Sequence, residues 1–139
     1  MTSSAWLFDT NAVSELLRPR PDPAYVRWVA SLPFTAQTVS AVTVAELFRG
    51  AYRTRAPLRH MENIRSRVLP NALVLPFDAE TAEIYGRMCA ALWDAGTPVE
   101  DFDVMIAATA AQHNLSVVTA NLKDFGRIPG VKIHPILQG

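Results

Sequence analysis

The sequence predicts an α/β fold in which a parallel sheet carries helices on both faces. Short apolar or β-branched runs alternate with stretches whose apolar residues recur at helical spacing, and only short breaks separate them. The length agrees, because 139 residues fit a single domain, placed at 1–139, and bury a core without covalent staples. Half of the residues are hydrophobic and 19% are charged, which is typical of a globular protein.

The first half of the chain is divided by prolines. We expect a strand at 5–8, helices at 11–18 and 24–31, a strand at 37–40, helices at 43–55 and 57–69, and a strand at 73–75. Pro19, Pro21 and Pro23 end the first helix, because proline cannot continue a helix, and Pro23 then suits the first turn of the second.

The second half repeats the alternation with longer helices. We expect a helix that ends at Ala95, a helix from Asp101 or Asp103 to His113, and strands at 116–119 and 131–134. Asp78 is placed to cap the first of these helices, and Gly96 to close it. Ile84, Met88 and Leu92 follow at four-residue spacing and mark its inner face.

Four acidic residues, Asp9, Glu46, Asp103 and Asp124, lie at or near the expected end of a strand or start of a helix. Each has apolar neighbours, and a carboxylate in apolar surroundings costs free energy unless a partner satisfies it. Functional groups of parallel sheets collect beyond the carboxyl ends of the strands, so these residues are expected to converge. Converging carboxylates repel each other, and a bound divalent cation is the usual remedy.

Oxygen-only ligands favour a hard divalent ion, Mg²⁺ or Mn²⁺, over zinc. Cys89 is the single cysteine, and His60, His113 and His134 have no partner at metal-ligand spacing. The chain has no glycine-rich phosphate loop, and no histidine lies in a nucleophile motif. Metal-dependent phosphodiester hydrolysis is therefore the predicted chemistry, with in-line attack by a metal-activated water.

Two of the acidic positions also have a structural explanation. Thr43 and Glu46 have the spacing of a capping box, so Glu46 is explained by helix capping, by metal binding, or by both. Asp101 lies two residues before Asp103, roughly 200° around a regular helix, so the two cannot share a face. We interpret Asp101 as a helix cap.

Positive charge is concentrated in one segment although the formal net charge is zero. Residues 49–67 contain six arginines and one acidic residue, and Arg49 and Arg53 lie four apart on the helix that carries Glu46. Arginine suits phosphate or carboxylate recognition. Three interpretations stay open for this ridge: binding of an RNA backbone, binding of an acidic or carboxyl-bearing stretch of a partner protein, or a solvated helix face.

Four segments in order resemble the motifs of PIN-domain ribonucleases. Residues 7–16 (LFDTNAVSEL), 40–50 (SAVTVAELFRG), 103–110 (DVMIAATA) and 119–125 (TANLKDF) have the order and spacing of those motifs, so the resemblance covers essentially the whole chain. The Asp-Thr-Asn opening followed by Ser-Glu-Leu is similar in particular to VapC and FitB-like toxins of toxin–antitoxin pairs.

This resemblance implies a three-layer α/β/α sandwich with a five-stranded parallel sheet in the order 3-2-1-4-5. It implies an Mg²⁺- or Mn²⁺-dependent endoribonuclease that forms a homodimer and is inhibited by a VapB-like antitoxin. Carried over by motif, Asp9 and Asp103 are the main metal ligands, and Glu46 and Asp124 complete the acidic pocket directly or through water. The matching polar positions are Asn11, Thr119 and Asn121.

Two other function classes stay open. Asn121 stands where many PIN domains have an acid, so a catalytically weak binding module of the same fold is one alternative. A phosphoryl-transfer domain is the other, although it needs a second acid at the position of Asn11. The chain shows no secretory signal and no apolar stretch of the roughly 18 residues that span a bilayer, so we expect a cytoplasmic protein with no membrane contact.

Overall fold

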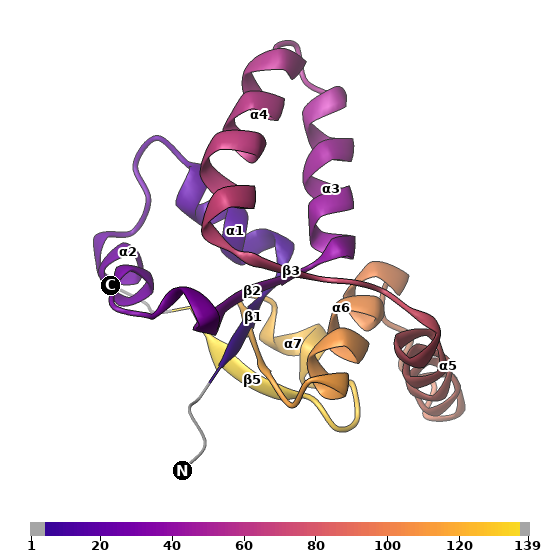
Figure 1. Ribbon diagram of the computed structural model, residues 1–139. Coiled ribbons are helices and arrows are strands. Elements are labelled where there is room, and N and C mark those ends of the chain that lie inside the picture. Colours follow the sequence, from indigo (N-terminus) through magenta and orange to yellow (C-terminus); the bar gives the residue numbers. More distant parts are fainter. Residues whose placement is uncertain (1–4, 137–139) are drawn as a thin grey trace.

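The computed structural model describes residues 5–136, which fold around a parallel sheet of five strands (Figure 1). The strands are β1 (Trp6–Phe8), β2 (Gln37–Ser40), β3 (Leu73–Leu75), β4 (Ser116–Thr119) and β5 (Lys132–Pro135). Their order across the sheet is β3-β2-β1-β4-β5, and every neighbouring pair is parallel. The predicted fold class, strand positions and strand order are confirmed.

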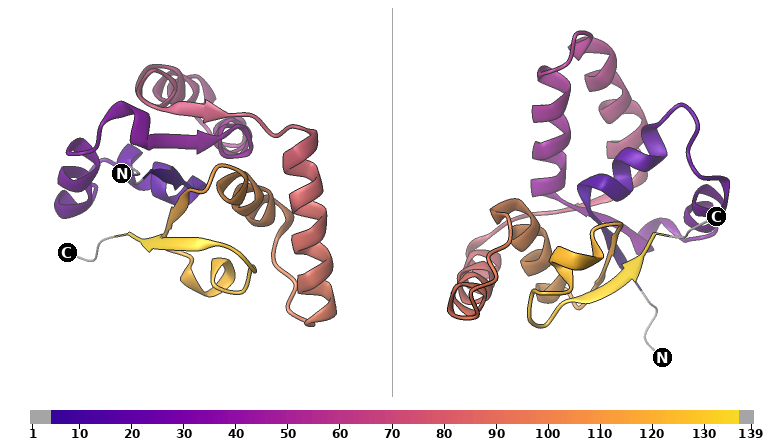
Figure 2. Two further views of the ribbon diagram at one scale, coloured as in Figure 1. Left: turned by 60° about the horizontal axis from the view of Figure 1, so that its bottom comes forward. Right: turned by 180° about the vertical axis from the view of Figure 1, so that it is seen from behind.

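Helices cover both faces of this sheet. They are α1 (Thr10–Leu17), α2 (Pro23–Ala30), α3 (Ala41–Tyr52), α4 (Pro57–Asn63), α5 (Ala79–Asp94), α6 (Asp101–Gln112) and α7 (Leu122–Phe125). Figure 1 shows α1, α3 and α4 on one side of the sheet and α5, α6 and α7 on the other. The right-hand view of Figure 2 shows α3 and α4 as a hairpin that rises from the sheet, and the left-hand view shows α5 along one side of the molecule.

The two helical layers enclose separate apolar clusters because successive side chains of a strand point to opposite faces. Leu7 of β1 packs in the cluster of α5, α6 and α7, and the next residue, Phe8, packs in the cluster of α1 to α4. In β4, Val117 and Val118 divide in the same way. Strands buried on both faces explain why these segments are continuous apolar runs.

The expected boundaries hold for most elements. Asp78 caps α5 in a capping box with Thr81, and Gly96, at a φ of 69°, follows the helix end. The helix expected at 57–69 is regular only as far as Asn63, where α4 ends. A π turn (Ile64–Val68) and a 3₁₀ turn (Leu69–Asn71) follow it directly. Helix α7 and a 3₁₀ turn at Phe34–Ala36 have no counterpart in the sequence prediction, since elements of three or four residues carry no periodic pattern.

Two of the expected helix caps are wrong. Ser40, not Thr43, is the N-cap of α3, and its hydroxyl accepts a hydrogen bond from the Val42 N–H at 3.0 Å. Asp101 is the first residue of α6 rather than its cap, and its carboxylate accepts a hydrogen bond from the Tyr85 hydroxyl at 2.9 Å. The side chain of Asp101 is thus held by α5.

No helix within residues 5–136 has both the length and the apolar character that crossing a bilayer demands.

Candidate functional site: an acidic pocket at the carboxyl edge of the sheet

Parallel strands place the acidic residues at one edge of the sheet. Asp9 follows the last residue of β1, and Asn121 and Asp124 follow β4, the neighbouring strand. Glu46 lies in α3, which begins directly after β2, and Asp103 lies in the first turn of α6. Because β1 is paired with both β2 and β4, segments distant in the sequence meet beyond its carboxyl end.

Asp9 is a buried carboxylate, with 2% of its surface exposed. It is the N-cap of α1 and accepts a hydrogen bond from the Ala12 N–H at 2.8 Å. Burial raises the pKa of Asp9 and the charge of Glu46 adds to the rise, while hydrogen bonds from the Thr119 side chain and the Ala12 backbone oppose it. The helix start therefore only partly satisfies a carboxylate that has lost its water.

Asp103 faces the other carboxylates of the pocket. Burial raises its pKa to about 6, and the negative charges of Asp9, Glu46, Glu100 and Asp124 contribute in that order. The charges of all three other predicted acids reach Asp103, so the four carboxylates lie at the same edge of the sheet. A pocket of mutually repelling carboxylates is a surface that favours a cation.

Neutral polar side chains connect the acids to each other. The Thr10 hydroxyl donates a hydrogen bond to Glu46 Oε1 at 2.5 Å. The Asn121 amide nitrogen donates to Asp124 Oδ2 at 3.1 Å and lies 3.5 Å from Asp103 Oδ2. Asn121 is also the N-cap of α7, so its amide both starts that helix and separates two carboxylates.

The donor set of this pocket fits a hard divalent cation. It consists of carboxylate and amide oxygens, with a buried carboxylate at Asp9 whose charge is not balanced. Within residues 5–136, no three His, Cys, Asp or Glu side chains are grouped closely enough to hold a metal by themselves. The residues present therefore suit an ion that keeps several of its own waters, as Mg²⁺ does.

The remaining predicted site residues divide into two groups. Thr119 is fully buried, is hydrogen-bonded to Asp9, and accepts from the Asn121 N–H at 2.8 Å. Asn11, by contrast, is exposed and lines a separate shallow pocket with Ala120. Arg53 is the C-cap of α3, just beyond its last turn, and is also exposed.

Arg49 reaches the acidic pocket. Its Nη2 atom lies 4.0 Å from Glu46 Oε2, and its guanidinium lies 4.8 Å from the centre of the Phe102 ring. Phe102 directly precedes Asp103, so this contact joins α3 to α6 beside the carboxylates.

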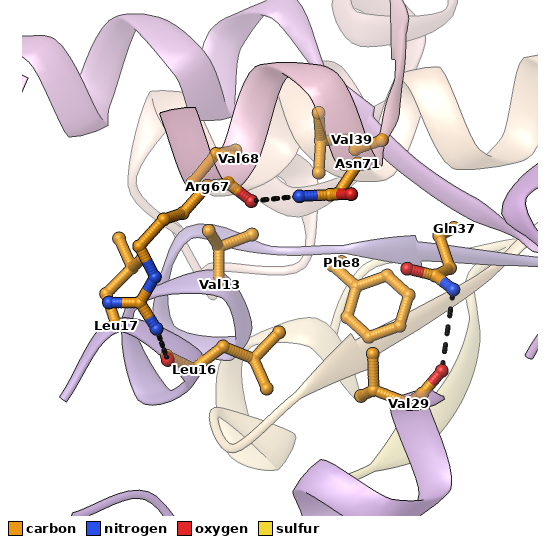
Figure 3. Close-up of a pocket in the computed structure, with 11 residues that line it drawn as sticks. Phe8, Val13, Leu16, Leu17, Val29, Gln37, Val39, Arg67, Val68 and Asn71 are labelled. Atoms are coloured by element: carbon orange, nitrogen blue, oxygen red, sulfur yellow. Dashed lines mark hydrogen bonds between the residues drawn. The ribbon is translucent and has the colours of Figure 1, made fainter. Parts of the chain in front are cut away.

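Two further hollows adjoin the helical layer of α1 to α4. An apolar pocket, whose lining includes Phe8, Val13 and Val39, lies between α1, α2 and the sheet (Figure 3). It contains none of the four acids, so it is not a place for metal-dependent hydrolysis. A second, more open groove starts at Thr10 and Glu46 and runs between α1 and the α3–α4 hairpin.

Two contacts of the acidic pocket were not predicted from the sequence, the hydrogen bond of Thr10 to Glu46 and the contact of Arg49 with Phe102. Thr10 follows Asp9 directly and could have been found as a hydroxyl in the first turn of a helix at the strand end. Phe102 lies next to Asp103, but an aromatic residue beside an acid gives no sign of the arginine that it contacts.

Comparison with known proteins agrees with this geometry. Residues 6–131 match the PIN domain family. The chain belongs to that family. VapC of Salmonella typhimurium, named as a tRNA(fMet)-specific endonuclease, is 34% identical to this PIN domain over 129 residues, which are 93% of this chain and 96% of the relative.

A toxin and a solved complex extend the likeness. The toxin FitB of Neisseria gonorrhoeae is 37% identical to this PIN domain over 124 residues, which are 86% of this chain and 89% of FitB. A chain in the crystal structure of DNA-bound VapBC from Salmonella typhimurium superimposes on this PIN domain with a TM-score of 0.88. That match has 32% identity and covers 97% of this chain and 100% of the other. The expected resemblance to VapC and FitB toxins is confirmed.

Proposed function

We propose that this PIN domain is a divalent-metal-dependent endoribonuclease and the toxin of a toxin–antitoxin pair. What supports the proposal is the gathering of Asp9, Glu46, Asp103 and Asp124 at one edge of the sheet, where burial and then the negative charges of the other acids raise the pKa of Asp103 to about 6. Carboxylates that repel each other cost stability, and a site of that kind is typical of a functional centre.

Asp9 and Asp103 are the residues that would hold the ion. Glu46, Asp124 and the Asn121 amide would orient its waters through hydrogen bonds. Mg²⁺ or Mn²⁺ supplies the positive charge that lowers the pKa of a bound water and neutralises phosphate oxygens. The chain's own contribution is to fix the position of these oxygens, with Thr119 and Ala12 holding Asp9 and Thr10 holding Glu46.

RNA fits the groove that leads away from this pocket. The groove begins at Glu46 and passes Arg18, Arg59 and His60, so basic side chains follow the acidic end. A phosphate chain that lies along the basic part would bring one phosphodiester to the carboxylates. Because one relative is named as a tRNA(fMet)-specific endonuclease, initiator tRNA is the first substrate to test. We place the activity in the cytoplasm.

Cleavage of RNA by the purified protein is the direct test. Wild type is incubated with initiator tRNA, ribosomal RNA and messenger RNA in Mg²⁺, in Mn²⁺ and in EDTA, beside Asp103→Ala. We expect cleavage with a divalent ion by wild type alone. Equal cleavage by Asp103→Ala means a contaminant or a wrong assignment, and binding of RNA without cleavage favours the alternative of a non-catalytic PIN module.

The partner is proposed on the same basis as the activity. Two related solved structures are the VapBC complex of Salmonella typhimurium and the FitAB complex bound to a DNA fragment, and we infer a VapB-like antitoxin and a homodimer for this chain. Induced expression should stop growth, and co-expression of the antitoxin encoded beside it should restore growth. Growth arrest that Asp103→Ala also causes would contradict a nuclease toxin.

A further inference from the structure

Arg49 occupies an unusual position between an acid and an aromatic ring. Its guanidinium stacks over Phe102 of α6, 4.8 Å from the ring centre, and its nearest carboxylate oxygen, on Glu46, is 4.0 Å away. The Arg49 side chain is 56% exposed, whereas that of Glu46 is 18% exposed. The guanidinium carbon thus lies over the Phe102 ring, and Nη2 lies beside the carboxylate of Glu46.

The ion pair between Arg49 and Glu46 is too weak to explain the position of the Arg49 side chain. A separation of 4.0 Å lies beyond hydrogen-bond length, and an exposed pair of this kind contributes little to stability. Stacking on an aromatic ring, by contrast, fixes the plane of the guanidinium and leaves its N–H donors free. A planar fork held in this way has little freedom to lose when it binds a phosphate in bidentate fashion.

We propose that Arg49 binds an RNA phosphate next to the one that is cleaved, and that Phe102 is a positioning residue that holds it there. The proposal rests on the proposed endoribonuclease function and names a contact within it. Arg49 is one helical turn after Glu46, and Phe102 is the residue before Asp103, so the fork is tied to both sides of the acidic pocket. The positive charge of Arg49 also offsets the negative charge of the acidic pocket, which would otherwise repel RNA.

The chain contains a matched control for this contact. Arg65 lies over the ring of Phe48, 5.9 Å from its centre, and comes from the π turn that follows α4. The same two side-chain types therefore meet on the α4 side of α3, whereas Arg49 reaches across to α6. Arg65→Ala removes the same charge and the same type of contact with an aromatic ring, and leaves the contacts of Arg49 with Glu46 and Phe102 in place.

The experiment compares binding and cleavage of a short single-stranded RNA by full-length variants. Binding is measured by fluorescence anisotropy in the Asp103→Asn background over a series of salt concentrations, and KM and kcat are measured for the same changes in the otherwise wild-type protein. Arg49→Ala should raise Kd and KM about tenfold to a hundredfold, with a smaller effect on kcat, because charge-assisted hydrogen bonds are lost. The slope of log Kd against log salt should fall by about 0.7.

Conservative variants separate positioning from charge. Arg49→Lys should recover the salt slope but not the full affinity, since an ammonium is a point charge without the fork. Phe102→Tyr should bind RNA like wild type, and Phe102→Leu should show part of the Arg49→Ala loss. Arg65→Ala should stay within about twofold of wild type, because Arg65 is exposed to screening by salt and lies over Phe48 rather than over Phe102.

Equal Kd values and salt slopes for Arg49→Ala and Arg65→Ala would overturn the proposal. If Arg49→Ala binds RNA normally but escapes the antitoxin, Arg49 belongs to the protein interface instead, and the proposal is likewise wrong. These outcomes are separate from failure of the proposed function, in which wild type itself neither binds nor cleaves RNA.

Discussion

At the scale of single residues, the acidic pocket contains side chains that cap helices and also contribute to the site. Asp9 is a good helix cap, yet burial still raises its pKa. Asn121 likewise caps a helix of only four residues while its amide nitrogen lies between two carboxylates. Residues that start helices at a sheet edge are fixed in position by the backbone, which is the property that a binding site requires.

Replacing Asp103 by asparagine should stabilise the metal-free protein at neutral pH. The pKa of Asp103 is about 6 in the folded protein and near its ordinary value in the unfolded chain, so the folded form takes up a proton first as pH falls. The contribution of Asp103 to wild-type stability in EDTA therefore decreases as pH rises from about 4 to 6. We expect Asp103→Asn to gain about 1–2 kcal/mol at pH 7.5, allowing for solvent screening, and nothing at pH 4.

Urea unfolding in EDTA at these two pH values measures the difference. Asp94→Asn, an exposed carboxylate at the end of α5, serves as the control and should change little at either pH. A gain from Asp103→Asn that is the same at both pH values would contradict the assignment of charge repulsion.

Replacing Asn121 by aspartate should destabilise the metal-free protein, which is the opposite of the effect expected for Asp103→Asn. The new carboxylate would replace an amide donor beside Asp103 and Asp124, and two like charges about 4 Å apart repel by roughly 1–4 kcal/mol near a protein surface. We expect a lower melting temperature in EDTA and a larger increase on adding Mg²⁺ than wild type shows. Asn121→Ala, which removes the amide without adding charge, distinguishes the two causes in the same thermal scans.

At the scale of elements, the start of α3 determines how Glu46 is used. Ser40 ends β2 and caps α3, so Glu46 falls in the second turn and its carboxylate is free to accept from Thr10. Thr43 is fully buried, and its hydroxyl lacks a hydrogen-bond partner among the described residues. Ser40 therefore caps α3, and Glu46 takes no part in the cap.

Two substitutions test this division. Ser40→Ala should cost about 1 kcal/mol, the usual loss for a missing N-cap. Thr43→Val should be neutral or stabilising, because it replaces an unsatisfied buried hydroxyl by a methyl group of the same shape. Urea unfolding of both variants gives the two values. If Thr43→Val were the more costly change, Thr43 would be the cap after all.

The same helix shows how far sequence reasoning reaches. The alternation of short apolar or β-branched runs with segments of helical spacing predicts the order of elements and the edge of the sheet at which Asp9 and Asp124 lie. Ser40 and Thr43 are both good N-caps, so only the end of β2 decides between them. The stacking of Arg49 on Phe102 joins residues 53 positions apart, and such a contact follows from helix packing that no local pattern encodes.

At the scale of the whole molecule, the acidic pocket joins parts of the chain that otherwise belong to different layers. Asp9 and Glu46 come from the layer of α1 to α4, and Asp103 and Asp124 come from the layer of α5 to α7. The two apolar clusters lie on opposite faces of the sheet, so the pocket at its edge is where both layers contribute polar groups. A cation bound there should stabilise the entire fold.

Added Mg²⁺ should therefore raise the melting temperature of the wild-type protein. A ligand at one hundred times its dissociation constant contributes about 2.7 kcal/mol, which is roughly 8 °C for a domain of this size. Asp9→Asn should lose most of this rise and still fold, because asparagine is also a good N-cap. Asp94→Asn, with its carboxylate on the surface of α5, should keep the full rise. Thermal scans of the three proteins over a range of Mg²⁺ and Mn²⁺ concentrations measure the effect, and equal shifts for wild type and Asp9→Asn would place the ion elsewhere.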